Sequence, residues 1–390
     1  CPAGGLQMRT PDTTTPIVLE FVRTTDAADA FAFQFQPQEY LLRRADGVFA
    51  PVQIPWNQAL LEDLAVLRQA GRDPAAVQRI GERLRSWLEP AGWSTLEAQI
   101  LDAQHRGLRV ALQIRAAAAE LYALPWELLS LRGTGQHLGE LAHVTIQYEW
   151  PRTEEGPLPD EDAGGTGLLL AWSAAGGSVP AAEHVALLEQ ACGAAALPFV
   201  PTRDVLAHAS YDRLRATLAA ATDRGEPVRV LHLLCHGGET GSTYGLCLHS
   251  DEGDGLAVVD AGRLRQLLGP FAGTLRLVVL SACDSGNSGT PGNQLGSVAQ
   301  TLHRAGIAAV VGSRYPLSRD GSLRAAAALY GRLISDTASL DQALRAVRQA
   351  LAQCTDGLDW ASLQLYAHPI AMHPEFRPLT FRPYRGLLSF

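Results

Sequence analysis

Two continuous apolar runs, residues 228–235 (VRVLHLLC) and 275–281 (LRLVVLS), constrain the fold of this chain most strongly. A strand buried on one face alternates apolar and polar residues, whereas these runs are apolar on both faces. Helical patterns accompany them near residues 209–222, 260–268 and 295–305. Continuous apolar strands joined by helices predict a doubly wound, mostly parallel sheet flanked by helices.

The same alternation of strands and helices extends over residues 168–368 and predicts one α/β domain. Its other expected strands are 168–172, 197–200, 308–312 and 361–367, and its other expected helices are 180–195, 321–334 and 339–353.

The pattern before residue 151 is mixed and predicts a separate α/β region. Its expected strands are 17–23, 31–42, 108–114 and 144–148, its expected helices are 57–70 and 74–89, and a helical turn is expected at 125–129. The segment 151–167 contains three Pro, four Gly and five acidic residues, which is typical of a linker. The predicted division is a flexible N-terminus 1–15, a region 16–150, the linker 151–167, a domain 168–368 and a tail 369–390.

Composition excludes several classes of protein. The net charge of -8 disfavours nucleic acid as a partner, because phosphate contacts need a basic surface. We find no apolar run of about 18 residues and no signal-peptide pattern at the N-terminus, so we expect no membrane contact. Six cysteines without a CxxC pair predict neither a disulfide framework nor a structural zinc site. A reducing cytoplasm follows as the expected compartment.

Reactive side chains follow both apolar runs. His236 comes directly after the first run, and Cys283 lies two positions beyond the second. Because parallel strands end at one edge of a sheet, both side chains are expected there. A cysteine thiolate is a strong nucleophile, and a neighbouring imidazole can generate it. The backbone N–H groups of Gly237 and Cys283 are candidate donors for an oxyanion hole.

Simpler interpretations exist for each of these residues. An isolated cysteine at a strand end is often a buried apolar residue, and an isolated histidine is often a core residue. His232, Cys247 and His249 could form a metal site with His236, but their spacing is not that of a metal motif. A nucleotide-binding domain is disfavoured, because no glycine-rich phosphate loop follows the first strand. No metal or cofactor is therefore expected.

The spacing of the two reactive residues is informative. Cys283 follows His236 by 47 positions, and caspases place the histidine about 50 residues before a cysteine in Q-A-C-x-G. The segments 236–237 (HG), 281–286 (SACDSG), 310–317 (VVGSRYPL) and 123–129 (ALPWELL) resemble those of CHAT domains, bacterial relatives of caspases and separases. The resemblance covers roughly residues 100–368.

This resemblance implies a cysteine endopeptidase with a caspase-like sheet and a degenerate, non-catalytic N-terminal half. It also implies an effector of bacterial defence or programmed cell death, in some cases CRISPR-associated, that cleaves a protein substrate. An activating partner or an upstream protease is expected to switch on such an enzyme. The alternative is a catalytically silent module that binds a partner peptide in the same cleft.

The resemblance also assigns roles to individual residues. Cys283 is the expected nucleophile and His236 the general base and acid. The expected substrate-binding residues are Ser281, Asp284, Ser313, Arg314 and Tyr315. Separases carry an aspartate, which holds a substrate arginine, where this chain has Pro316, so basic specificity would depend on Asp284. Asp284 could instead cap a local turn.

All 32 basic residues of the chain are arginines, which a GC-biased genome explains. If Asp284 favours a basic residue, self-cleavage must follow an arginine. The predicted sites are Arg152, Arg224 and Arg319, with Arg152 cut first because it lies in the polar segment 151–167.

Overall fold

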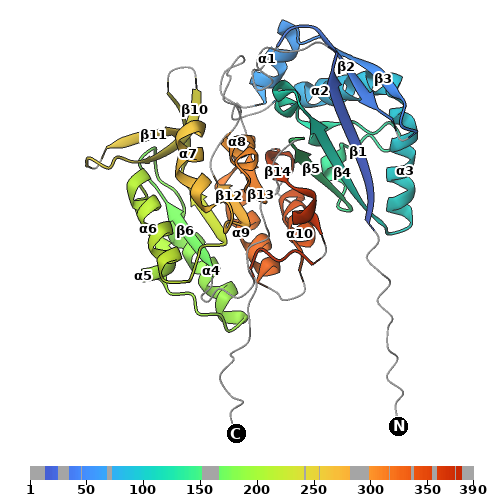
Figure 1. The fold of residues 1–390 in the computed structure, drawn as a ribbon. Helices are drawn as coiled ribbons and strands as arrows, with labels where there is room; N and C mark the ends of the chain where they lie inside the picture. The colour runs from blue at the N-terminus through green and yellow to red at the C-terminus, as the bar shows by residue number, and fades with distance from the viewer. Residues whose placement is uncertain are drawn as a thin grey trace, which may run out of the picture.

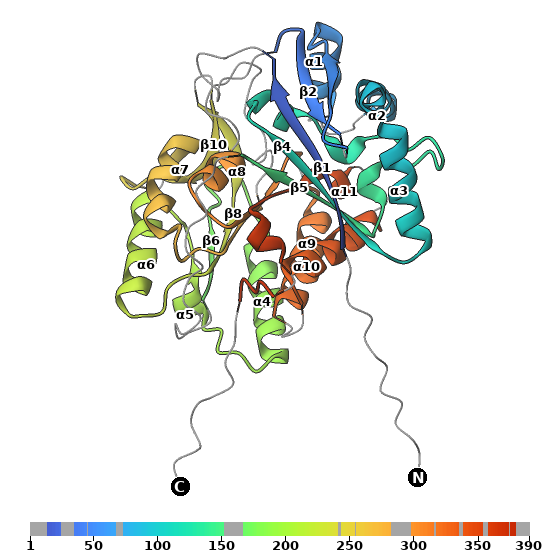
Figure 2. The same ribbon diagram turned by 45° about the vertical axis from the view of Figure 1, so that its right-hand side comes forward.

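One large sheet runs through the protein, with a small second sheet beside it, in the computed structural model (Figure 1). The structure describes residues 14–24, 35–44, 46–67, 73–151, 167–240, 243–253, 255–281, 298–315, 317–334, 338–353, 358–373 and 375–379. The large sheet has 11 strands in the order β3-β2-β1-β4-β5-β14-β13-β12-β8-β6-β7, and the small sheet has the order β11-β10-β9. Helices lie on both sides of the large sheet, so the predicted fold class is confirmed (Figure 2).

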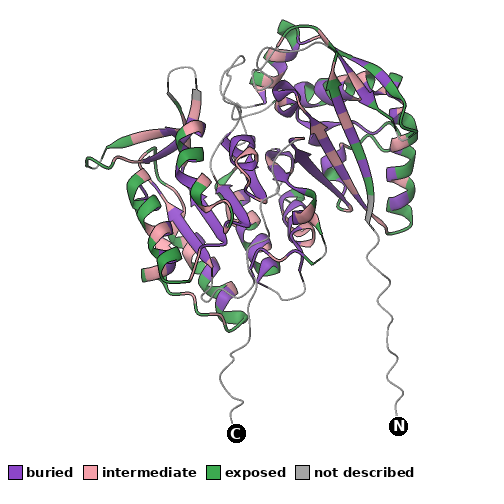
Figure 3. Ribbon diagram, in the orientation of Figure 1, coloured by how far each residue is buried: buried purple, intermediate pink, exposed green. Residues whose placement is uncertain are grey.

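The N-terminal half contributes β1 Thr14–Arg23, β2 Gln38–Arg43, β3 Phe49–Ile54, β4 Arg109–Ala116 and β5 Val144–Glu149. Strands β1, β4 and β5 are parallel, and the antiparallel pair β2 and β3 extends the edge beside β1. Its helices are α1 Gln58–Val66, α2 Pro74–Leu88 and α3 Trp93–His105. In β4, buried residues alternate with half-buried ones, so one face of this half is better covered than the other (Figure 3).

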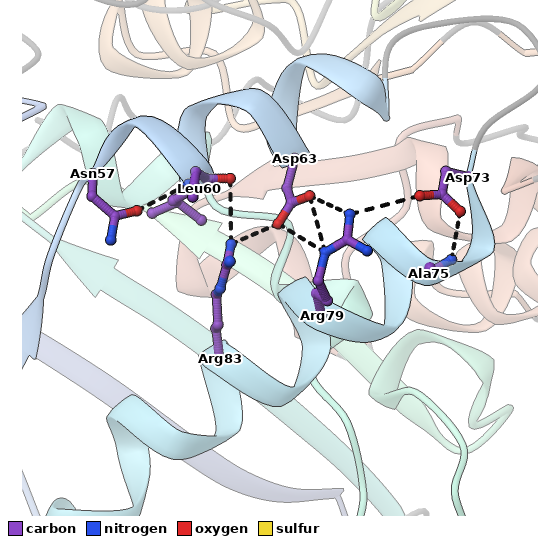
Figure 4. A network of polar contacts seen from close by, with 8 residues as sticks. Asn57, Leu60, Asp63, Asp73, Ala75, Arg79 and Arg83 are labelled. Atoms are coloured by element: carbon purple, nitrogen blue, oxygen red, sulfur yellow. Dashed lines mark hydrogen bonds and ion pairs between the residues drawn. The ribbon is translucent and has the colours of Figure 1, made fainter.

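Helices α1 and α2 are joined by an ion-pair network around Asp63 (Figure 4). Its carboxylate accepts hydrogen bonds from Arg79 at 2.6 Å and from Arg83 at 2.7 Å. The hydrogen bond from Arg79 contributes most to lowering the pKa of Asp63, although burial opposes it. Asn57 and Asp73 cap the two helices by accepting backbone N–H groups of Leu60 and Ala75. The network fixes the two helices relative to one another.

The C-terminal half contributes β6 Leu168–Trp172, β7 Val205–Leu206, β8 Val230–Leu234, β12 Leu277–Ser281, β13 Ala309–Ser313 and β14 Leu363–Ala367. All neighbouring strands from β7 to β13 are parallel, whereas β14 runs antiparallel to β13. β14 pairs in parallel with β5, through Leu365 opposite Gln147 and Tyr366 opposite Tyr148. The two halves of the chain therefore share one continuous sheet.

Helices cover both faces of the C-terminal half, and strand β8 shows why. Leu231 and Leu233 belong to one core cluster, whereas Val230 and Leu234 belong to the other. The first cluster includes residues of α6 Tyr211–Asp223, α7 Ala261–Leu268 and α8 Val298–Arg304. The second includes residues of α4 Ala181–Ala194, α9 Arg319–Leu333 and α10 Leu340–Ala352. Side chains alternate between the faces of a strand, so a strand buried on both faces is mostly apolar, and His232 is the one polar residue of β8.

The small sheet was not predicted from the sequence. It consists of β9 His236–Thr240, β10 Thr243–His249 and β11 Leu256–Asp260, all antiparallel. It lies beside α6 and α7 and projects from the sheet (Figure 1). Because β9 begins two residues after β8 ends, the segment that carries His236 is a strand and not a loop.

The strand predicted at 197–200 is wrong. Residues 197–200 form neither helix nor strand, and the edge strand of the sheet is β7, after the short helix α5 Pro201–Asp204. Pro198 has no N–H group for a ladder, which disfavours a strand there. Residues 25–34, 152–166, 282–297 and 380–390 lie outside the described residues, so the linker remains a prediction. Among the described helices, none has the length and hydropathy to span a bilayer.

Candidate active site

The predicted reactive residues follow two strands that are direct neighbours. β8 and β12 are parallel, and Leu234 lies opposite Ser281 at their ends. The N–H group of Cys235 donates to the carbonyl of Ser281 at 3.3 Å, which extends the pairing by one residue. Strands β8 and β12 therefore end at the same edge of the sheet. Cys283 and Asp284 lie outside the described residues, so the Cys283–His236 dyad remains a prediction.

His236 is the first residue of β9 and is half-buried. Its Nε2 lies 3.2 Å from the backbone carbonyl of Ser178, in the loop that follows β6. A carbonyl only accepts hydrogen bonds, so Nε2 carries the proton and, in the neutral ring, Nδ1 has the free lone pair. The loop after β6 thereby selects the tautomer of His236.

Two glycines make room for the His236 ring. A Cβ atom on Gly176 would lie 3.0 Å from the Cβ of His236, and one on Gly177 would lie 3.1 Å from its Nε2. Gly177 also has a φ of +137°, which disfavours any side chain. Sequence reasoning missed this loop, although the loop after the first strand of a doubly wound sheet commonly lines the site.

Ser281 belongs to a buried hydrogen-bond network. Its Oγ lies 2.7 Å from Nε2 of His232, and Nδ1 of His232 lies 2.8 Å from the hydroxyl of Tyr330. Burial holds the pKa of His232 well below its usual range, and the nearby His184 adds to this effect. The neutral ring joins Ser281 to α9 and fixes the end of β12. In this structure the Ser281 hydroxyl therefore contacts His232.

The segment after β13 contacts the N-terminal half. The guanidinium of Arg314 donates to the backbone carbonyls of Tyr122, Ala123 and Leu124 at 2.8, 2.6 and 3.1 Å. Ser313, Arg314 and Tyr315 are 1%, 5% and 2% exposed as whole residues. Their backbone is also engaged, because Ser313 pairs with Leu363 of β14 and the N–H group of Arg314 donates to the carbonyl of Ser362 at 2.6 Å. All three residues are buried in this structure, so their contacts with a substrate remain a prediction.

The remaining predicted residues have diverse surroundings. Gly237 lies in β9 opposite Leu246, and its predicted oxyanion role depends on Cys283. Arg224 follows α6 and forms an ion pair with Glu226 at 3.9 Å. Arg319 begins α9 and pairs with Glu183. Arg152 lies outside the described residues.

The alternative metal ligands fall into separate networks. His232 bonds to Ser281 and Tyr330, whereas His249 bonds to Ser173 and His208. Within the described ranges, the structure holds no group of three or more His, Cys, Asp or Glu residues arranged to bind a metal ion.

Three buried histidines make the fold sensitive to acid. Burial lowers the pKa of His184 to about 4, and it places those of His232 and His303 well below the usual range. Below about pH 6.5 the unfolded chain binds protons that the folded chain does not, so the free energy of unfolding decreases as the pH is lowered. Between pH 7.5 and 5, we expect His184 alone to lower the free energy of unfolding by about 2 kcal/mol. Urea unfolding at both pH values measures this change.

The variant His184→Gln removes one of the three groups, so its free energy of unfolding should decrease less steeply than that of the wild type as the pH is lowered. The matched control is His105→Gln, because His105 is exposed at the end of α3. Equal slopes for His184→Gln and the wild type would contradict this account.

One family model and several solved structures are similar to this chain. A family model described as CHAT domain matches residues 82–368. A search of curated proteins finds no match. The Arg-specific cysteine proteinase gingipain R of Porphyromonas gingivalis is 11% identical, with a TM-score of 0.44, over 79% of this chain and 69% of that chain.

Two further solved structures are similar at low identity. Separase of Saccharomyces cerevisiae, in its complex with securin, is 13% identical with a TM-score of 0.41, over 67% of this chain and 15% of that chain. A secreted C11 cysteine protease of Bacteroides thetaiotaomicron is 12% identical with a TM-score of 0.31, over 48% of this chain and 58% of that chain.

Proposed function

Because the chain belongs to the CHAT domain family, we propose that it is a cysteine endopeptidase in which Cys283 and His236 form the catalytic dyad. One observation carries the proposal: β8 and β12 are parallel neighbours in register at Leu234 and Ser281. The two proposed catalytic residues each follow those positions by two residues. The names of gingipain R and the C11 protease describe cysteine proteases, which agrees with this assignment.

The tautomer of His236 suits the first step of peptide-bond cleavage. With Nε2–H bonded to Ser178, the Nδ1 lone pair accepts the thiol proton of Cys283 while Sγ attacks the substrate carbonyl carbon. The C–N bond then breaks, and Nδ1–H protonates the leaving amine. Water then attacks the thioester and gives one proton to Nδ1, the C–S bond breaks to release the acid, and Nδ1–H returns that proton to Sγ. The N–H groups of Gly237 and Cys283 would stabilise the oxyanion in both steps.

The proposal includes activation and a cellular role. We propose that a partner or an upstream protease activates the enzyme, and that it acts as an effector in bacterial defence or cell death. Peptide-library cleavage by the wild type and Cys283→Ala, before and after limited proteolysis, tests the catalytic part. Binding of library peptides without turnover under every activating condition would identify a silent regulatory module instead.

Self-cleavage should occur first after Arg152. If Asp284 favours a basic P1 residue, only bonds after arginine qualify, because the chain has no lysine. A protease binds its substrate extended, so a bond in a folded turn must first unfold. Arg224 and Glu226 donate backbone N–H groups to Ala220 and Ala221, and Arg319 lies in the first turn of α9.

Mass spectrometry of products over time measures the order of these cuts. We expect the product that ends at Arg152 before any that ends at Arg224 or Arg319, and Arg152→Gln should remove it. Cuts after non-basic residues would contradict the basic pocket without affecting the dyad.

Substituting Gly177 with alanine should impair catalysis without unfolding the protein. The added Cβ would lie 3.1 Å from Nε2 of His236, and the φ of +137° would be strained. Displacing the ring by about 1 Å should lower kcat about 10- to 100-fold. The matched control is Gly193→Ala, because a Cβ there meets nothing within 4 Å. Equal kcat values for Gly177→Ala and the wild type would show that the loop after β6 does not position His236.

A further inference from the structure

A chain of three side chains lies next to the loop that holds His236. Oγ of Ser173 is 3.0 Å from Nδ1 of His249, and Nε2 of His249 is 3.3 Å from Nδ1 of His208. The two imidazole rings are perpendicular, at 87° and 4.9 Å between centroids. Ser173 is 0% exposed, so a substrate cannot reach its hydroxyl and a second nucleophilic site is excluded. These three side chains can therefore affect a reaction only by holding the backbone segments to which they are hydrogen-bonded.

Ser173 is bonded to both segments that determine the position of His236. Its N–H group donates to the carbonyl of Leu234 at 2.9 Å, two residues before His236. Its Oγ accepts the N–H group of Ala175 at 3.3 Å, and the N–H group of Gly177 donates to Ala174 at 3.1 Å. The turn so formed ends at Ser178, whose carbonyl accepts Nε2–H of His236.

His249 is itself firmly placed. It ends β10, where Cys247 lies opposite His236, and its N–H group donates to the carbonyl of Ala209 at 2.9 Å. His208 packs against Trp172, the last residue of β6, with 4.6 Å between ring centroids. The imidazole of His249 is thus a rigid partner that reaches Ser173 from the small sheet.

We propose that His249 and Ser173 are positioning residues for His236. By holding the 173–178 turn, they keep the Ser178 carbonyl on Nε2 of His236 and so keep the proton on that nitrogen. Without them, His236 exchanges between its two neutral tautomers. In the molecules that carry the proton on Nδ1, this nitrogen cannot act as the base. This inference rests on the proposed function for its kinetic consequence but not for its structural one.

The test compares two substitutions of one residue. The variant His249→Phe keeps the ring volume but removes the hydrogen-bonding nitrogens. The variant His249→Asn keeps a polar atom near the position of Nδ1 and should rescue the bond to Ser173. In 15N-histidine NMR spectra, we expect the wild type and His249→Asn to show the Nε2–H tautomer of His236, and His249→Phe to show a mixture. Spectra of His236→Ala assign the signal.

Kinetics give the second readout. We expect His249→Phe to lower kcat about 10- to 100-fold with KM within about twofold, and His249→Asn to recover most of the loss. His373→Phe, at an exposed position far along the chain, is the matched control. Ser173→Ala replaces His249→Phe if that variant does not fold.

An unchanged His236 tautomer in folded His249→Phe or Ser173→Ala would overturn the inference. So would an equal loss of kcat in His249→Phe and His249→Asn. If the wild type cleaves no peptide, the proposed function fails, but the NMR comparison still decides whether His249 and Ser173 position His236.

Discussion

Replacing Cys283 with alanine should abolish peptide-bond cleavage, with kcat/KM lower by about 10⁴-fold or more. The thiolate is the only proposed group that forms a covalent bond with the substrate, and alanine offers no substitute nucleophile. Cleavage of a fluorogenic peptide chosen from the library measures the loss. Binding of the same peptide should remain within about threefold, because alanine removes a single sulfur atom from the cleft.

Cys192→Ala is the matched control for this prediction. Cys192 lies on α4 in the core, and burial raises the pKa of its thiol to about 11, so it is a poor nucleophile. Its loss should leave the turnover unchanged. Undiminished turnover in Cys283→Ala would contradict the assignment of the nucleophile.

The second large effect is expected for His236→Ala. Without the imidazole, no base at Nδ1 takes the thiol proton, and no acid protonates the leaving amine. Loss of general acid and base catalysis should lower kcat about 10²- to 10⁴-fold. Alkylation of Cys283 by iodoacetamide near pH 7 should also become slower, because a smaller fraction is thiolate. Stopped peptide-cleavage assays and mass spectrometry measure the two effects.

His105→Ala is the control for this substitution, because His105 is exposed on α3 in the N-terminal half. It should match the wild type in both assays. If His236→Ala slows neither turnover nor alkylation, another residue must serve as the base.

The sheet of the C-terminal half was predictable because its strands are buried on both faces. Residues 230–234 and 277–281 each hold four apolar residues out of five, the exceptions being His232 and Ser281, and such runs between helices are typical of strands covered on both faces. The strand β7 was not predictable, since it has two residues and gains its place from pairing with β6. Its neighbour at 197–200 has the apolar residues of a strand, but Pro198 cannot complete a ladder.

The sequence placed His236 just after the end of β8, but it did not reveal the segments that surround this residue. The sequence HGGET in β9 has the glycines of a loop, and only its pairing with β10 makes it a strand. The roles of Gly176 and Gly177 depend on a ring that is about 60 positions away in sequence, so no local pattern contains them. Contacts of this kind require the tertiary structure.

The N-terminal segment 123–129 acquires a physical role that its sequence alone does not reveal. The carbonyls of Ala123 and Leu124 accept hydrogen bonds from Arg314, which follows β13. A guanidinium buried among carbonyls needs all of its partners, because an unpaired buried charge costs several kcal/mol. The N-terminal half therefore fixes the segment after β13, which is proposed to receive a substrate.

The most direct test of the dyad is to map which residue a peptidyl acyloxymethyl ketone alkylates in the activated wild type and in His236→Ala. We expect a single adduct on Cys283 by tandem mass spectrometry, formed at least about 10-fold more slowly in His236→Ala. Buried Cys192 and Cys247, whose pKa values are both raised by burial, should remain unmodified. An adduct on another residue, or cleavage of the peptide while Cys283 stays unmodified, would contradict the account.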